Sequence, residues 1–118
     1  MARDLSIDHT TYGNVAVVRP EGDIDLSVSP QLRRALLATL EEGRDVVVDM
    51  GAVPYIDSSG IAGLAEGLQA ARRAGCRFAL ARPGEAALKV LRIARLDRVF
   101  IIQDTPDPSF GGDPPRDP

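Results

Sequence analysis

The chain has 118 residues and a formal net charge of −3, from 14 basic and 17 acidic side chains. Its length suits one domain with a single core, and a hydrophobic content of 44% is typical of a globular protein. The sequence has no basic stripe that would bind nucleic acid, and Cys76 has no second cysteine with which to form a disulfide. It shows no apolar run long enough to span a membrane and no signal peptide. We therefore expect a cytoplasmic protein without a direct nucleic-acid partner, a disulfide or a cofactor.

The N-terminal residues predict a β-hairpin. Residues 5–9 alternate between apolar and polar side chains, and residues 15–18 form a short apolar run. Gly13 lies in the turn between them, so the two strands are expected to pair. Residues 23–25, Asp-Ile-Asp, follow as a loop or a short strand.

A helix and a buried strand are predicted next. Ser29 followed by Pro30 is typical of a helix start with a serine N-cap, and Gly43 is suited to the helix end. Residues 46–48 are three valines, which indicates a strand covered on both faces.

The second half repeats this alternation of helix and strand. An apolar stripe that starts at Ile61 predicts a second helix, which ends near Gly75. Residues 78–81 are expected to form a strand, Pro83 to precede a third helix, and residues 99–102 to form a last short strand.

This order of elements predicts an α/β fold with a mixed, largely parallel sheet of four or five strands. The N-terminal hairpin is its antiparallel part, and three or four helices are expected to pack on the sheet. Residues 1–103 are expected to form the domain. Residues 104–118 are rich in proline, glycine and aspartate, and are expected to be a disordered or loosely docked tail.

The segment YIDSSGIAGL, residues 55–64, has several interpretations. A nucleophilic serine at position 58 needs a base, but the only histidine is His9, and Ile56 replaces the first glycine of a hydrolase elbow. A Walker-type loop needs an adjacent lysine, but the only lysine is Lys89. Both of these enzymatic interpretations are therefore disfavoured.

A helix cap explains only part of the segment. Asp57 or Ser58 is expected to cap the second helix, which stabilises it by roughly 1 kcal/mol. Gly60, Gly63 and Gly67 share one flank of that helix, although each lowers helix propensity by ~0.8–1 kcal/mol relative to alanine. Such a smooth strip suits either tight packing inside the domain or docking of a partner, and the sequence leaves both open.

The sequence VVVDMGAVPYIDSSGIAGL, residues 46–64, resembles the central signature of STAS domains, in particular the bacterial anti-sigma-factor antagonists. GDID at residues 22–25 is similar to the G-x-[LIV]-D segment of that family. Residues 75–100 resemble its closing strand and helix. The resemblance runs from about residue 5 to residue 102 and implies the STAS fold.

The resemblance also implies a regulatory switch. In the family, the serine after the aspartate is phosphorylated by a partner that is both a serine kinase and an anti-sigma factor. The unmodified antagonist binds that kinase and frees the sigma factor, and the phosphorylated form does not. Ser58 would then be the phosphoacceptor, Ser59 would order the helix start, and Asp57 would border the kinase interface. A serine phosphatase is a further expected partner, and the protein itself would be a binding module rather than an enzyme.

Asp25 matches the aspartate of the family's other loop and is expected to line the same surface. The expected partner-binding residues are Asp25, Asp57, Ser58, Ser59, Gly60, Ala62, Gly63 and Gly67.

Three alternatives remain at this point. The chain could be a STAS subunit of another assembly, such as a lipid-transport complex or a stress-signalling scaffold. Asp23, Asp25 and Asp57 could instead mimic the acidic cluster of a response-regulator receiver, but no lysine ends the last predicted strand. Nucleotide binding without hydrolysis has no positive support in the sequence.

Overall fold

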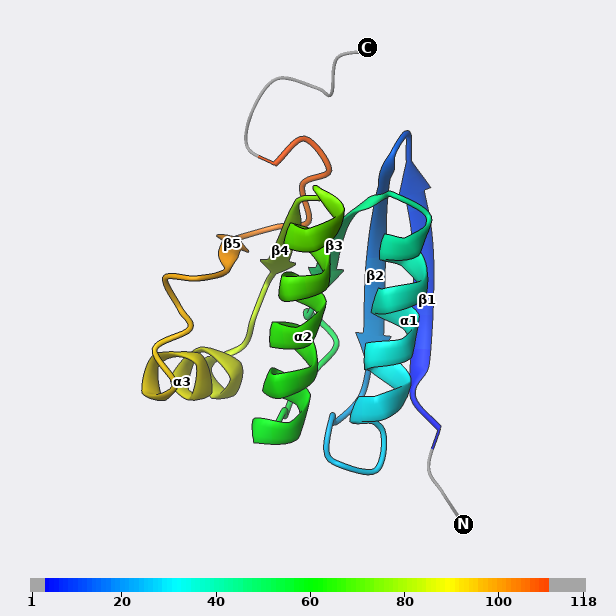
Figure 1. The fold of residues 1–118 in the computed structure, drawn as a ribbon. Helices are drawn as coiled ribbons and strands as arrows, with labels where there is room; N and C mark the ends of the chain where they lie inside the picture. The colour runs from blue at the N-terminus through cyan, green and yellow to red at the C-terminus, as the bar shows by residue number, and fades with distance from the viewer. Residues whose placement is uncertain (1–3, 111–118) are drawn as a thin grey trace.

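Strands and helices alternate along the chain, and the computed structural model describes residues 4–110. The elements of this part are β1 (Ser6–Tyr12), β2 (Val15–Glu21), α1 (Ser29–Glu41), β3 (Asp45–Asp49), α2 (Ser58–Ala74), β4 (Phe78–Ala81), α3 (Glu85–Ile93) and β5 (Ile101–Gln103). The strands form one sheet in the order β1-β2-β3-β4-β5, with β1 antiparallel to β2 and the other neighbours parallel (Figure 1). The predicted α/β class, mixed sheet and N-terminal hairpin are confirmed.

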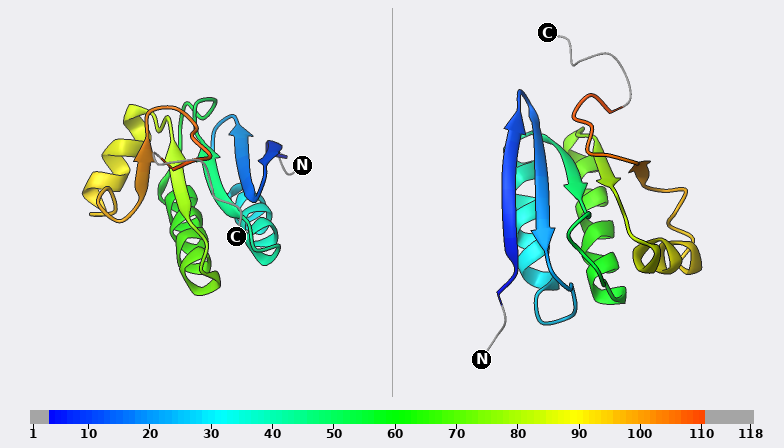
Figure 2. Two further views of the ribbon diagram at one scale, coloured as in Figure 1. Left: turned by 90° about the horizontal axis from the view of Figure 1, so that it is seen from above. Right: turned by 180° about the vertical axis from the view of Figure 1, so that it is seen from behind.

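The sheet has two different faces. Helices α1 and α2 cover one face, and α3 lies beside the β5 edge (Figure 2). Side chains alternate along a strand, so Val46 and Val48 of β3 enter the main core under the helices, whereas Val47 points to the opposite face. The main core is therefore built between the sheet and the two parallel helices.

The face opposite the helices carries a smaller apolar cluster, which residues 104–110 cross (Figure 2). The Phe110 ring lies 4.4 Å from the guanidinium carbon of Arg77, and the side chain of Gln103 exchanges two hydrogen bonds of 2.8 and 3.0 Å with the backbone of Asp107. The cluster consists of Val15, Val47, Ala79 and Ala81, with Val17 and Phe110 packed against it. These contacts hold the first part of the predicted tail on the sheet. The domain boundary at residue 103 stays a prediction, and the disorder expected for residues 111–118 lies outside the described residues.

The start of α1 differs from the prediction. Val28, not Ser29, occupies the N-cap position, and Ser29 is the first helical residue. No side chain caps this helix; instead the backbone carbonyl of Asp25 accepts hydrogen bonds from the N–H groups of Val28 (3.1 Å) and Ser29 (2.8 Å). The helix ends as predicted, with Gly43 in the left-handed conformation at φ 77°.

The last strand also begins later than predicted, at Ile101. The N–H groups of Val99 and Phe100 both bond to the carbonyl of Leu96, so a turn extends to Phe100 before strand pairing starts. The Phe100 side chain is buried beside Phe78, with ring centroids 6.2 Å apart.

An ion pair between a buried carboxylate and a partly exposed arginine lies where β3 ends, on the face opposite the helices. The Asp49 side chain is only 5% exposed and accepts hydrogen bonds from Arg82 Nη2 (2.7 Å), Arg82 Nε (3.0 Å) and the Gly51 N–H (3.0 Å). Arg82 has φ 52°, and this left-handed conformation turns its side chain back toward Asp49. A Cβ atom at Gly51 would lie 2.6 Å from the Arg82 guanidinium carbon, so a larger residue there would push the guanidinium aside.

These contacts set the ionisation of Asp49. Burial alone would raise the pKa of this carboxyl, but the hydrogen bonds from Arg82 and Gly51 and the charges of Arg82 and Arg19 outweigh it and lower the pKa below its ordinary value. Arg19 Nε lies 3.6 Å from the Asp49 carboxylate and supports the same charge. Asp49 therefore stays a carboxylate to a lower pH than an ordinary aspartate does.

Candidate functional site: the start of helix α2

Ser58 is the first residue of α2, and Asp57 is its N-cap. The Oδ1 atom of Asp57 accepts hydrogen bonds from the N–H groups of Ser59 (3.0 Å) and Gly60 (3.2 Å) and from the Ser59 hydroxyl (2.5 Å). The Ser59 hydroxyl is thus occupied in ordering the helix start. Ser58, in contrast, is exposed, and its hydroxyl makes no hydrogen bond to any of residues 4–110. Of the two serines, Ser58 is the one free to react.

The positive end of α2 makes this position favourable for negative charge. Unpaired N–H groups and the helix dipole stabilise an anion at a helix N-terminus by about 0.3–1 kcal/mol. At the C-terminal end of α2, the positive charges of Arg72 and Arg73 offset the negative end of the helix dipole before the left-handed Gly75. An anionic group on Ser58 would therefore be compatible with the helix.

The two acidic loops of the sequence lie side by side. Ile24 and Ile56 form an isolated parallel bridge, in which the Ile24 N–H bonds to the Tyr55 carbonyl (2.9 Å) and the Asp57 N–H to the Ile24 carbonyl (3.1 Å). Asp25 and Asp57 follow directly after the bridged isoleucines. The structure therefore brings the Asp25 loop next to the start of α2.

The two loops also share their local geometry. The Oδ1 atom of Asp25 accepts bonds from the Ser27 N–H (3.0 Å) and hydroxyl (2.5 Å), as Asp57 does from Ser59. Each aspartate side chain thereby accepts hydrogen bonds from a residue two positions further on, in place of a backbone carbonyl, and so orders its own loop. The surface around Ser58 is consequently built from two ordered loops.

Exposed apolar side chains flank Ser58, and the sequence analysis did not select them. Leu26 is 72% exposed and Tyr55 is 50% exposed. A shallow groove of about 180 Å³ runs from Leu26 along the start of both helices; it is lined by Leu26, Ser29, Pro30, Arg33, Ser59, Ala62, Gly63 and Glu66. We call Asp25, Leu26, Tyr55, Asp57, Ser58 and Ala62 the serine surface. The sequence places Leu26 next to Asp25 and Tyr55 two positions before Asp57, which could have indicated a binding surface. Their exposure, however, depends on the tertiary fold.

The glycine strip of α2 divides into two parts. All three glycines are buried, but a Cβ atom would lie only 2.5 Å from Ile56 Cγ1 at Gly60 and 3.1 Å from the Phe78 ring at Gly67. Tight packing inside the domain is therefore the role that the structure shows for these two. Gly63 differs, since its Cβ atom would meet nothing closer than 3.8 Å, and it lines the groove. We leave Gly60 and Gly67 out of the serine surface.

This difference predicts opposite effects of the same substitution. Gly60→Ala should lower the free energy of unfolding by about 1–3 kcal/mol, because the new methyl group overlaps Ile56 and Ile24 in a close-packed site. The matched control, Gly63→Ala, should be neutral or stabilise by up to about 1 kcal/mol through helix propensity. Urea unfolding monitored by circular dichroism measures both. Equal destabilisation by the two variants would contradict this account of the packing.

Two other site types receive no support from residues 4–110. This part of the chain contains no group of three side chains that could hold a metal ion. Nor does it contain a helix with both the length and the apolar character needed to cross a bilayer.

Comparison with known proteins agrees with this architecture. The STAS domain family matches residues 6–108. Among solved structures, the chain is similar to an anti-sigma factor antagonist from Thermotoga maritima (TM-score 0.79, 23% identity, covering 84% of this chain and 86% of that one). It is also similar to an anti-sigma factor antagonist from Mycobacterium paratuberculosis (TM-score 0.75, 24% identity, covering 86% of each chain). A third similar structure is the phosphorylated form of the Bacillus cell fate determinant SpoIIAA (TM-score 0.66, 17% identity, covering 83% of this chain and 89% of that one). At these identities the structural likeness establishes the fold, and the family match covers nearly all of the described residues. The chain therefore belongs to the STAS domain family.

Proposed function

We propose that this protein is an anti-sigma-factor antagonist whose unmodified form binds an anti-sigma serine kinase, and that phosphorylation of Ser58 abolishes this binding. One observation carries the proposal: Ser58, the first residue of α2, is exposed within the serine surface, and its hydroxyl has no hydrogen-bond partner among residues 4–110. The similar structures described as anti-sigma factor antagonists support the same role, and one of these proteins, SpoIIAA, is known in both an unphosphorylated and a phosphorylated form.

The chemistry of a phosphate at this position suits a switch. A phosphoserine adds about −1.5 to −2 charges, and the N-terminus of α2 tolerates them within the folded domain. The carboxylates of Asp25 and Asp57 lie on the same surface, so the modified surface is strongly negative. A partner that covers it must desolvate that charge, which opposes binding.

The unmodified surface has what a protein partner requires. Leu26 and Tyr55 offer large apolar side chains, and the two ordered loops hold them in place without a loss of backbone entropy on binding. The bound kinase would then release its sigma factor, and a serine phosphatase would restore the unmodified form. In this role the protein is a kinase substrate and a binding module.

Phosphate uptake tests the proposal directly. We expect incubation with the anti-sigma serine kinase of the native host and ATP to produce phosphoserine at position 58, located by mass spectrometry. Ser58→Ala should take up no phosphate, and the control variant Ser59→Ala should still be modified, because the Ser59 hydroxyl serves only to order the helix start.

Other results would redirect the assignment. An unmodified protein that instead co-purifies with a membrane ATPase would indicate a STAS subunit of a transport assembly. An acid-labile acyl phosphate would indicate receiver chemistry on an aspartate, and either finding would overturn the role of Ser58.

A further inference from the structure

We propose that α3 and the turn after it, at the β5 end of the sheet, bind a short acidic segment of a partner protein that also carries large apolar side chains. This second surface consists of Leu88, Lys89, Arg92, Ile93, Arg95 and Arg98, and it shares no residue with the serine surface.

The backbone of Arg95 provides the first argument. Arg95 has φ 60° and occupies the position after α3 that a left-handed glycine fills after the other helices, Gly43 at φ 77° and Gly75 at φ 72°. Such a conformation is unfavourable for a residue with a Cβ atom. The other positive-φ residues that are not glycine gain contacts in return: Arg82 pairs with Asp49, and Phe110 packs on the sheet.

Arg95 gains no such contact within the part of the chain that is described. Its backbone closes the end of α3, with the Arg95 N–H bonded to Arg92 (3.0 Å) and the Leu96 N–H to Leu91 (2.7 Å), but glycine would form both bonds equally well. The side chain is exposed and makes no ion pair with any of residues 4–110. We infer that its partner belongs to another molecule.

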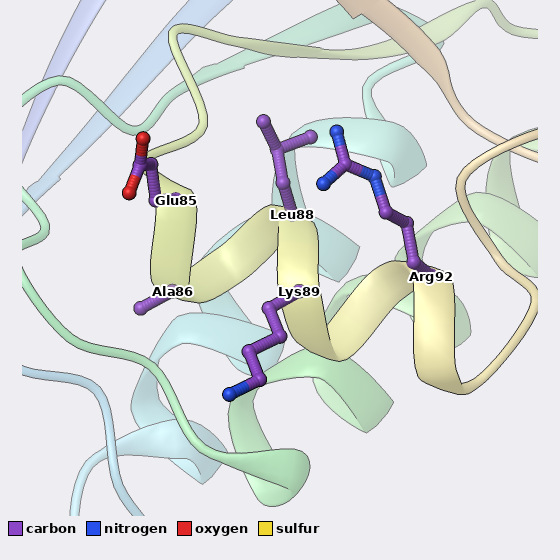
Figure 3. Close-up of a pocket in the computed structure, with 5 residues that line it drawn as sticks. All are labelled: Glu85, Ala86, Leu88, Lys89 and Arg92. Carbon is purple, nitrogen blue, oxygen red and sulfur yellow. The ribbon is translucent and has the colours of Figure 1, made fainter.

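The neighbouring cations are in the same situation. Within residues 4–110, Lys89, Arg92 and Arg98 are exposed and likewise lack an ion pair, whereas Asp45, Asp49 and Glu66 on other elements are paired. Figure 3 shows Leu88 and Arg92 extended on one flank of α3 and Lys89 on the other. A hollow of about 560 Å³ lies against this helix and is lined by Glu85, Ala86, Leu88, Lys89 and Arg92.

An apolar anchor lies among these cations. Ile93 is 74% exposed. It follows Ala86 and Lys89 by seven and four positions, so the helical period places all three on one face. Val99, in the turn before β5, is also exposed. Cations around exposed aliphatic side chains are complementary to an acidic segment with apolar side chains.

Other occupants fit less well. Nucleic acid or an anionic membrane is large enough to respond to the charge of the whole molecule. That net charge is −3, so it would repel both. A short segment responds mainly to charges within a Debye length of about 8 Å, and the four cations of this surface outnumber the two acidic residues beside them, Glu85 and Asp97. In a two-fold symmetric dimer, a second copy of the chain would place its own unpaired cations against these and would be repelled as well.

The test uses the isotope-labelled full chain and a short acetylated peptide in which glutamates flank leucines. Amide chemical shifts should change at residues 85–99 and not around Ser58. The affinity should fall about tenfold or more in the double variant Arg92→Glu, Arg95→Glu, and severalfold between about 0.05 and 0.3 M salt.

Arg95→Gly separates binding from a structural role. It should weaken peptide binding severalfold and raise the melting temperature by a few degrees, because glycine accepts the left-handed conformation without strain. A lower melting temperature would mean that Arg95 serves the fold. Equal binding of a peptide with lysine in place of glutamate, shifts centred on Ser58, or tighter binding to phosphatidylglycerol vesicles or duplex DNA would each overturn the proposal.

Discussion

Phosphorylation of Ser58 is expected to weaken binding to the anti-sigma kinase by about a hundredfold or more, which requires only about 2.8 kcal/mol. The penalty arises in the complex, where the phosphate and the carboxylates of Asp25 and Asp57 must all be desolvated. Calorimetry with the enzymatically phosphorylated protein measures it. Ser58→Ala should bind at full strength, and Ser58→Asp should show a smaller loss, because aspartate adds only one charge.

The stability of the modified protein distinguishes this mechanism from unfolding. The melting temperature of the phosphorylated protein should stay close to that of the unmodified one, because an anion is favourable at the start of α2. If binding and the melting temperature fell together, the switch would operate by melting the helix start. If binding remained at full strength, the role of Ser58 as a switch would be rejected.

Asp49→Ala is expected to lower the free energy of unfolding by about 2–3 kcal/mol. The substitution removes a buried carboxylate together with the hydrogen bonds that it accepts from Arg82 and Gly51. Arg82 and Arg19 are partly exposed and can regain water, which keeps the loss below that of a fully buried pair. Glu66→Gln is the matched control: the Arg33–Glu66 pair is exposed on both sides, so urea unfolding should show a change of at most about 1 kcal/mol.

The same carboxylate predicts a dependence of stability on pH. The pKa of Asp49 is lowered in the folded protein, so its contribution is complete above the unfolded-state pKa of about 4 and is lost as the pH falls through the folded-state pKa. The free energy of unfolding should therefore fall in acid, and it should fall less steeply in Asp49→Asn. Parallel curves for the two proteins would show that other carboxylates control acid unfolding.

The features that depend on neighbours in the sequence could be predicted before the structure. The order of strands and helices followed from hydrophobic periodicity. A cap at Asp57 or Ser58 followed from residue type, and the structure selects Asp57, whose accepted bonds come from Ser59 and Gly60 within one turn. The helix at Ser29 was misplaced by one position, because a backbone carbonyl of Asp25 replaces the expected side-chain cap, and the sequence carries no mark of that bond.

The features that depend on the tertiary fold could not be predicted. Gly60 and Gly63 look alike on a helical wheel, but only Gly60 faces the isoleucines of the two bridged loops. The left-handed backbone of Arg82 was equally hidden, since Asp49 is distant in the sequence. The exposure of Leu26 next to Ser58 likewise required knowledge of how the two loops meet.

The bridge between Ile24 and Ile56 fixes the positions of the two loops independently of the side chains that those loops expose. Main-chain atoms make its hydrogen bonds, so they survive any change of exposed side chain that leaves the backbone in place. The residues at positions 26 and 55 can therefore be exchanged while the Ser58 hydroxyl keeps its place at the start of α2. Recognition could thus be redesigned on this scaffold without rebuilding the chemistry.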